Sequence, residues 1–467
     1  MLWSYSSSCP PMESVNPATA ESIASYDALS AEEVDTAIAD ASAAYEEWRD
    51  VDLTDRQQLL DDAADVLREN KHRYAETITE EMGKPISQAI AEVEKCTWGC
   101  EFYAERANEY LQDEHVGAVS HAKTYVRYDS LGLVLAVMPW NYPFWQAFRF
   151  AAPNLVAGNV GLLKHASNVS GCALVIEEVF EKAGFPENTF QSLLIGSSKV
   201  DQVIEDDRVA AVTLTGSEYA GRAVAETAGR ELKKTVLELG GSDPFVVLDD
   251  ADIERTCKVA AKARNQNSGQ SCIAAKRFIV HEDVYDEFVD AFTAKIESLT
   301  VGNPIDEETD IGPQAREDLM EELHEQVQAS VDAGAKVLAG GEPLDREGYF
   351  YPPTVLTDVP QTCPAAAEET FGPVAAVIPV SDEEEAIEVA NDSPYGLGGS
   401  VWTTDLDRGE CLAGRIEAGC VFVNELVKSD PRLPFGGVKD SGYGRELGRD
   451  GIHEFVNKKT VWVQDTE

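Results

Sequence analysis

The chain has 467 residues, 43% of them apolar, which favours a folded protein of about three domains over a disordered chain or a small disulfide scaffold. Its 84 acidic residues outnumber its 38 basic ones, and the formal net charge of −46 argues against nucleic acid or an anionic membrane as a partner. Because the acidic residues are spread along the whole chain, we expect a halophilic cytoplasmic protein, with an ordinary acidic protein as the alternative.

The first predicted elements are helical. Residues 1–11 lack the basic start and apolar stretch of a signal peptide, and we expect them to be an extension that precedes the folded part. Between about 31 and 111 the apolar residues have helical spacing, and the sequence Gly83-Lys84-Pro85 interrupts them. This pattern predicts a bundle of three helices.

From Tyr125 onward, short β-rich runs alternate with amphipathic helices, which predicts parallel α/β sheets. The expected strands of the first sheet are 125–128, 131–138, 160–163, 209–214 and 235–239, and its helices include 171–183 and 218–230. The alternation restarts with strands near 244–248, 277–280, 374–380 and 420–423 and helices near 252–264 and 283–299. Two α/β domains with a seam near Gly240 and Gly241 follow. The uncharged window 130–148 contains Pro139, Asn141 and Pro143, so we reject a transmembrane helix there.

The nine cysteines are odd in number, and they form neither a CxxC motif nor a Cys/His cluster with metal-ligand spacing. We therefore expect a reducing compartment and no metal. Cys96 and Cys100 stand one helical turn apart and could share a metal, but thiols in an apolar core are favoured because no third ligand lies nearby.

Two short segments indicate a nucleophile and a base. In residues 267–272 (NSGQSC), Cys272 follows a glycine and small hydroxyl residues, so the backbone can turn sharply and leave the sulfur accessible. A buried structural thiol is the alternative. Glu238 interrupts an apolar strand before Gly240 and Gly241, and burial would raise its pKa toward that of a general base. A salt bridge at the strand end is the alternative.

Two further segments indicate anion binding. Asn141 lies between Pro139 and Pro143 at the end of a hydrophobic strand, and a rigid amide of this kind can hydrogen-bond an oxyanion. Gly216 and Ser217 lead from a strand into a helix, whose free N–H groups would face an anion such as a pyrophosphate. An ordinary helix cap would have the same sequence.

In this order the four segments resemble the aldehyde dehydrogenase superfamily, from about Asn16 to the end of the chain. Further matching motifs are NPAT at 16–19, KHAS at 164–167, EETFGP at 368–373 and PFGGVK at 434–439. Residues 164–166, 239–245 and 274–277 are most similar to the shorter bacterial NAD(P)-dependent succinate-semialdehyde dehydrogenases.

The resemblance implies an α/β fold with two parallel-sheet domains and a small β oligomerisation element. It assigns residues 12–118 and 134–240 to a cofactor-binding domain, 241–452 to a catalytic domain, and 119–133 with 453–467 to the oligomerisation element. That element would join a hairpin near 119–133 to a terminal strand near 453–463. A homodimer or homotetramer is therefore expected, with a small-molecule aldehyde as the other partner.

The resemblance also implies the reaction, which is the oxidation of an aldehyde with NAD or NADP through a cysteine thiohemiacetal and a thioester. Cys272 would be the nucleophile, Asn141 and the backbone N–H of Cys272 would hold the oxyanion, and Glu238 would activate water. The residues implied for cofactor binding are Pro139, Trp140, Asn141, Lys164, Ser167, Gly216, Ser217, Leu239, Glu369 and Phe371. The family places an acidic residue at position 167, so the serine predicts weak discrimination against NADP.

Arg149 and Ser429 correspond to residues that hold the remote carboxylate of succinate semialdehyde, and a guanidinium suits a carboxylate. Gln266 stands where some members carry another arginine, and Arg264 is expected to point elsewhere. A purely structural role for Arg149 is the alternative. Because position 274 is alanine, Cys272 cannot form a disulfide with a cysteine two residues later.

Three other functions remain as alternatives. A CoA-acylating dehydrogenase would share Cys272, but the retained Glu238 disfavours it. A cysteine hydrolase would need a histidine near the thiol, and none of the seven histidines lies in a suitable motif. A non-catalytic binding protein would have no reason to retain Cys272, Glu238 and Asn141 together.

Overall fold

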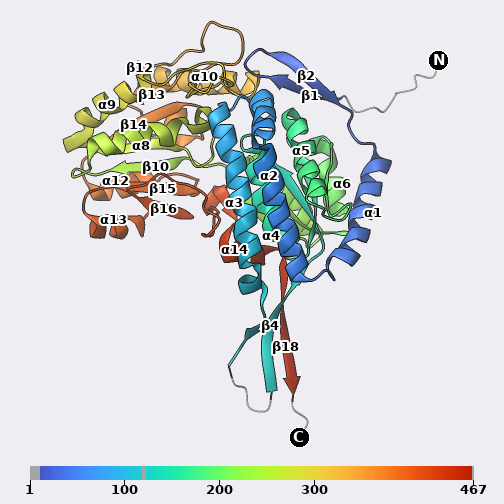
Figure 1. Ribbon diagram of the computed structural model, residues 1–467. Coiled ribbons are helices and arrows are strands. Elements are labelled where there is room, and N and C mark those ends of the chain that lie inside the picture. Colours follow the sequence, from blue (N-terminus) through green and yellow to red (C-terminus); the bar gives the residue numbers. More distant parts are fainter. Residues whose placement is uncertain (1–10, 118–121, 465–467) are drawn as a thin grey trace.

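Two largely parallel sheets form the body of the molecule in the computed structural model, which describes residues 11–117 and 122–464 (Figure 1). The first sheet has the strand order β17-β9-β8-β5-β6-β7. Its strands are β5 (Leu133–Met138), β6 (Val160–His165), β7 (Phe190–Ser192), β8 (Val209–Thr215), β9 (Lys234–Glu238) and β17 (Gly442–Tyr443). β17 is antiparallel to β9, and the other neighbours are parallel. All six residues of β6 are buried, so both faces of the sheet are covered.

Three helices lie between residues 31 and 111, as predicted, but they do not form one bundle. Helix α2 (Leu53–Met82) packs against α3 (Ile86–Leu111), whereas α1 (Ala31–Trp48) packs against the first sheet (Figure 1). The break falls at Gly83, whose φ of 77° is a left-handed conformation that favours glycine, and Pro85 then precedes α3. The other helices of this half are α4 (Pro143–Val156), α5 (Ser170–Lys182), α6 (Val200–Glu205) and α7 (Glu218–Arg230).

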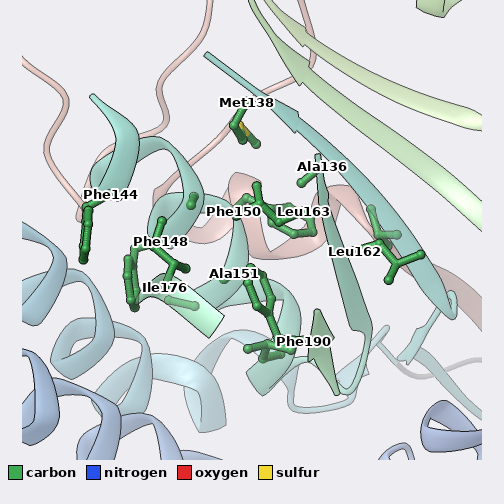
Figure 2. Close-up of a cluster of buried hydrophobic side chains, with 14 of the residues drawn as sticks. Ala136, Met138, Phe144, Phe148, Phe150, Ala151, Leu162, Leu163, Ile176 and Phe190 are labelled. Carbon is green, nitrogen blue, oxygen red and sulfur yellow. The ribbon is translucent and has the colours of Figure 1, made fainter. Parts of the chain in front are cut away.

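Helix α4 is one of several elements that the sequence pattern did not reveal. All 14 of its residues are buried, so it has no polar face to produce an amphipathic period. Phe144, Phe148 and Phe150 of α4 pack in the core with Leu162 of β6 and Phe190 of β7 (Figure 2). No helix in the described part of the chain is long and apolar enough to cross a membrane.

The chain passes from the first sheet to the second between Glu238 and Asp243. The second sheet has the order β12-β13-β14-β11-β10-β15-β16, with β12 antiparallel to β13 and the other neighbours parallel. Its strands are β10 (Asp243–Val247), β11 (Ala275–His281), β12 (Lys336–Ala339), β13 (Thr354–Thr357), β14 (Val374–Val380), β15 (Gly398–Trp402) and β16 (Cys420–Val423). The helices of this half are α8 (Ile253–Asn265), α9 (Glu282–Glu297), α10 (Glu317–Asp332), α11 (Pro364–Ala367), α12 (Glu383–Asn391) and α13 (Leu406–Ala413).

A third sheet forms an arm that extends away from the body (Figure 1). In it β18 (Val456–Gln464) pairs with β4 (Ala122–Ser130), and β4 pairs with the short β3 (Glu114–His115). The terminal strand begins later than residue 453 because α14 (Gly448–Glu454) precedes it. The antiparallel pair of β3 and β4 corresponds to the hairpin expected near 119–133, and it begins earlier, at Glu114. The strand expected at 125–128 is part of β4, so it belongs to this arm and not to the first sheet. A second hairpin of β1 (Met12–Asn16) and β2 (Glu21–Tyr26) lies near the N-terminus.

Parts of two predictions lie outside the described residues. These parts are the N-terminal extension up to residue 10 and, in the oligomerisation element, residues 119–121 and 465–467. The division into cofactor-binding, catalytic and oligomerisation segments stays a prediction. Cys96 and Cys100 are buried in the core of the first half, as expected for packing thiols.

Candidate active site

Cys272 lies in a loop between α8 and β11 whose backbone is tightly constrained. The residues before it form a 3₁₀ turn, in which Asn267, Ser268 and Gly269 have φ values of 56°, 55° and 76°. A side chain on Gly269 would overlap the backbone of Gly372, so only glycine fits there. Asn267 Nδ2 donates to the Asn141 carbonyl at 2.7 Å and thereby ties the loop to the segment after β5.

Arg264 holds this loop through hydrogen bonds to its backbone and to neighbouring segments. Its side chain is fully buried, and the guanidinium donates to the carbonyls of Gly269, Thr370, Gly372 and Ala275. Both Nη atoms of Arg264 are engaged by the backbone and the residue does not line the cavity around Cys272, which agrees with the expectation that it points elsewhere.

The thiol of Cys272 is partly exposed in a cavity of about 590 Å³. Burial raises its pKa to about 12, and the positive charges of Arg149 and Lys276 act in the opposite direction. The thiol is therefore protonated at neutral pH, and a nucleophilic role requires a base to remove the proton. Gln266, Arg149 and Ser429 line the same cavity.

Asn141 reaches the loop from the carboxyl end of β5. Its Nδ2 donates to the Gln270 carbonyl at 3.1 Å, and its Oδ1 accepts from Gln146 at 3.0 Å. These two bonds fix the amide plane and leave the second N–H of Nδ2 to donate elsewhere. The structure thus brings Asn141 and the Cys272 loop together, as an oxyanion site would require.

Glu238 ends β9, and its carboxylate is buried without a hydrogen-bond partner among the described residues. Burial, followed by the nearby charge of Glu446, raises its pKa well above the usual range, while Arg149 and Arg445 oppose the shift. Burial raises the pKa of the Cys420 thiol, and the charges of Asp243, Glu238 and Cys272 add to the rise, so Cys420 lies near both Glu238 and Cys272. A buried, unpaired carboxylate near a thiol has the properties of a general base.

Arg149 is more strongly held by the protein than the sequence suggested. The guanidinium is buried, Nε pairs with the Glu446 carboxylate, and Nη2 donates to Gln146 Oε1 at 3.3 Å and Thr215 Oγ1 at 3.2 Å. The structure therefore supports a structural role for this arginine. Any contact with a substrate must come from Nη1, because Nε and Nη2 are engaged.

The residues expected to bind a cofactor lie along the carboxyl edge of the first sheet, where dinucleotides bind in doubly wound folds. Pro139 and Trp140 follow β5, Lys164 and Ser167 lie at and after the end of β6, Gly216 and Ser217 follow β8, and Leu239 follows β9. These strands are neighbours in the order β9-β8-β5-β6. Ser217 caps α7, so the helix-cap reading is correct, and it leaves the free N–H groups of the helix at this edge.

Glu369 and Phe371 reach this edge from the second half of the chain. The Trp140 and Phe371 rings meet edge to face with centroids 5.6 Å apart. Glu369 Oε1 accepts from the Gly241 N–H at 3.0 Å and pairs with Lys276 at 3.3 Å. Lys276 Nζ also donates to the Cys272 carbonyl at 2.7 Å, so it connects the cofactor edge to the nucleophile loop.

The surroundings of Lys164 suit the binding of a phosphorylated dinucleotide at this edge. Its side chain is buried, burial lowers its pKa, and no ion pair or hydrogen bond to the ammonium is formed within residues 11–117 and 122–464. A buried cation without a protein anion suits a ligand that brings its own negative charge. Ser167, three residues later, is partly exposed and adds no carboxylate.

Several residues of the site escaped the sequence analysis. Lys95 and Trp145 line the cavity, and Glu446 pairs with Arg149. Lys95 and Trp145 come from long helices of the first half, and Glu446 comes from the C-terminal segment. No spacing in the sequence could reveal these contacts, because they depend on how distant segments pack.

The family model for the Aldehyde dehydrogenase family matches residues 3–461. The probable succinate-semialdehyde dehydrogenase [NADP(+)] of Synechocystis sp. is 53% identical over 449 residues, 96% of this chain and 99% of that protein. Succinate-semialdehyde dehydrogenase [NADP(+)] 1 of Mycobacterium tuberculosis is 50% identical, over 97% of this chain and 100% of the relative. The crystal structure of succinic semialdehyde dehydrogenase from Streptococcus pyogenes in complex with NADP⁺ superimposes with a TM-score of 0.95 at 39% identity, covering 97% and 100% of the two chains.

Proposed function

The chain belongs to the aldehyde dehydrogenase family, and we propose that it oxidises succinate semialdehyde to succinate with NADP as the preferred electron acceptor and NAD as an alternative. The observation that carries the substrate is the charge of the cavity around Cys272. Six basic side chains line it against two acidic ones, although acidic residues outnumber basic ones 84 to 38 in the whole chain. The basic residues are Lys95, Arg149, Lys258, Lys262, Lys295 and Lys428. A cavity with this reversed charge favours an aldehyde that carries a carboxylate.

In the proposed reaction, Glu238 removes the proton from the Cys272 thiol as sulfur bonds to the aldehyde carbon. The free N–H of Asn141 and the backbone N–H of Cys272 hold the oxyanion. NADP held at the edge of the first sheet would supply the hydride acceptor, and loss of hydride from this carbon leaves a thioester on Cys272. Glu238 releases the thiol proton to solvent and then removes a proton from water, which attacks the thioester. The C–S bond breaks, the acid leaves, and the Cys272 sulfur takes the proton back from Glu238. Retention of a buried, unpaired Glu238 supports hydrolysis over transfer to CoA.

We assign the cofactor residues as the resemblance implied. Lys164 and Ser167 would hold the ribose of the adenosine half. Trp140, Gly216 and Ser217 would line the cofactor cleft, with Pro139 and Asn141 beside them. Leu239 would lie near the nicotinamide, Glu369 would contact its ribose, and Phe371 would pack alongside.

Replacing Ser167 by glutamate is expected to lower kcat/KM for NADP by about tenfold or more and to change that for NAD much less. A carboxylate beside the extra phosphate adds like-charge repulsion, which NAD does not meet. Steady-state kinetics with both cofactors measure the effect. Ser42→Glu is the matched control, because Ser42 is a partly exposed serine on α1, one turn before Tyr45, which hydrogen-bonds Ser130 at the opposite edge of the sheet. Equal losses for the two cofactors would show that Ser167 does not face the phosphate.

We further propose a homodimer or homotetramer in a halophilic, reducing cytoplasm. β18 is an edge strand of the arm, and its Trp462 and Val463 are about half exposed, so a second subunit pairing there would cover them. The eight cysteines of the described chain are all free thiols, which supports a reducing compartment. The charge of −46 supports concentrated salt, since screening relieves the self-repulsion.

One experiment tests the substrate and the salt proposal together. Reduction of NADP and NAD is measured with succinate semialdehyde and with butanal, at about 0.1 M KCl, where the Debye length is about 10 Å, and at multimolar KCl. We expect kcat/KM to favour the semialdehyde by on the order of ten to a hundredfold. We also expect the thermal midpoint to rise with KCl. Equal kcat/KM for both aldehydes would contradict the substrate proposal, and a constant midpoint would contradict halophily.

A further inference from the structure

Lys95, Trp145 and Ser429 form a polar cluster in the wall of the cavity that contains Cys272. Lys95, on α3, donates from Nζ to Ser429 Oγ at 2.7 Å, and its ammonium lies 4.4 Å from the centre of the Trp145 ring. Trp145 Nε1 donates to the same Ser429 oxygen at 3.0 Å. The cluster therefore joins α3, α4 and the C-terminal segment at one place.

The hydrogen bonds of this cluster leave donors without acceptors. Ser429 Oγ accepts from both Lys95 and Trp145, so its two lone pairs are engaged and its own proton must be donated elsewhere. In the described chain, no acceptor for that proton is present, and no carboxylate lies within ion-pair distance of Lys95. The Lys95 ammonium and the Ser429 hydroxyl are therefore both donors in the cavity wall that have no anion to bind.

Arg149 differs from Lys95 in this respect. Its Nε pairs with Glu446, and its Nη2 donates to Gln146 and Thr215. The positive charge of the arginine is already compensated by a protein carboxylate, whereas that of Lys95 is not. An incoming carboxylate gains most from the uncompensated cation.

We propose that Lys95 determines specificity by binding, together with the Ser429 hydroxyl, the carboxylate of the aldehyde substrate that is remote from the reacting carbon. This inference rests on the proposed function, because it requires a carboxylated aldehyde. Lys95 holds that end of the substrate while the aldehyde carbon lies at Cys272 in the same cavity. Ser429 has the role that the sequence predicted. Lys95, instead of Arg149, makes the main charged contact with the substrate carboxylate.

The wild-type enzyme offers a test that needs no substitution. The charged and titratable groups around the ammonium are Arg149 on α4, Glu92 and Cys96 on α3, and Asp430 beside Ser429. Burial, followed by the charge of Arg149, lowers the pKa of Lys95 to about 8. The ammonium is lost as the pH rises through that value, so KM for succinate semialdehyde should increase there, and KM for butanal should not.

A pair of substitutions gives the second test. Lys95→Met keeps an apolar chain on Trp145 but removes the charge, and we expect kcat/KM for succinate semialdehyde to fall by about tenfold to a hundredfold. In the same variant kcat/KM for butanal should change by less than about twofold, which is close to the error of such comparisons. Lys71→Met is the matched control, because Lys71 pairs with Glu94 of the same helix bundle outside the cavity. Lys95→Arg, which stays charged, should abolish the alkaline rise in KM.

The outcomes separate this inference from the proposed function. If wild-type enzyme shows no preference for the semialdehyde over butanal, the proposed function fails. If it prefers the semialdehyde but Lys95→Met loses equal activity on both aldehydes, or none on either, Lys95 does not bind the carboxylate. A Lys95→Met protein that does not fold would leave the wild-type pH profile to decide, and a KM that stays constant through pH 8 would overturn the inference.

Discussion

Replacing Cys272 by alanine is expected to abolish aldehyde-dependent reduction of the cofactor, with a loss on the order of 10⁵-fold or more. The substitution removes the thiol that bonds covalently to the aldehyde carbon in the proposed reaction, and hydride leaves only from the resulting adduct. The cavity itself should survive, because alanine fits the space of a partly exposed thiol. Absorbance of the reduced cofactor measures the loss.

The matched control for that experiment is Cys411→Ala, because Cys411 is an exposed thiol on α13. It should retain full activity and the same thermal midpoint as wild type. Activity of Cys272→Ala well above the uncatalysed background would assign the chemistry to another group.

Replacing Glu238 by glutamine is expected to slow steady-state turnover by about 10² to 10⁴-fold. Glutamine has almost the same shape and tolerates burial, but it cannot remove a proton from water. Acylation should also slow, because Glu238 takes the proton of the Cys272 thiol, but hydrolysis of the thioester should slow more. Rapid mixing should therefore show a burst of reduced cofactor that forms more slowly than in wild type and is followed by still slower release. The two half-reactions are thereby separated.

The pH dependence has a defined sign. Burial and the charge of Glu446 raise the pKa of Glu238, and the base is active only when ionised, so kcat should fall as the pH decreases through that raised pKa. Glu238→Gln should lose this dependence, whereas Glu226→Gln, on the exposed surface of α7, should keep it. Unchanged turnover in Glu238→Gln would mean that another group activates the water.

The role of Arg149 shows how a structure changes the choice of experiment. Sequence similarity alone favours Arg149→Ala as the test of substrate specificity. In the structure, that substitution would leave Glu446 buried without its cation and would remove one of the charges that lower the pKa of Glu238. Both aldehydes would then react more slowly, so Lys95 is the cleaner position at which to test the carboxylate contact.

The sequence was most informative where function depends on short local segments. Glu238 ends β9 and Asn141 follows β5, and the alternation of strands and helices places such residues at one edge of a sheet. Cys272 lies in the loop before β11 and was predicted from the small residues that precede it. The alternation also predicted several strands to within a few residues. It missed α4, because a helix that is apolar on every face has no period, and it missed Lys95, which is 334 positions from Ser429 in the sequence.

The left-handed turn at Asn267, Ser268 and Gly269 also bears on how this enzyme can be made more stable. Ser268 is a non-glycine residue in a conformation that costs roughly 1 to 3 kcal/mol, and the turn holds it there before any substrate arrives. The nucleophile loop therefore adopts its bent conformation during folding and does not have to rearrange at each turnover. Glycine at this position would relieve that strain, but it would also remove the Ser268 Oγ that accepts from the buried Gly312 N–H at 2.9 Å. The two effects on stability oppose each other, and the enzyme would have a more mobile thiol and a slower first step.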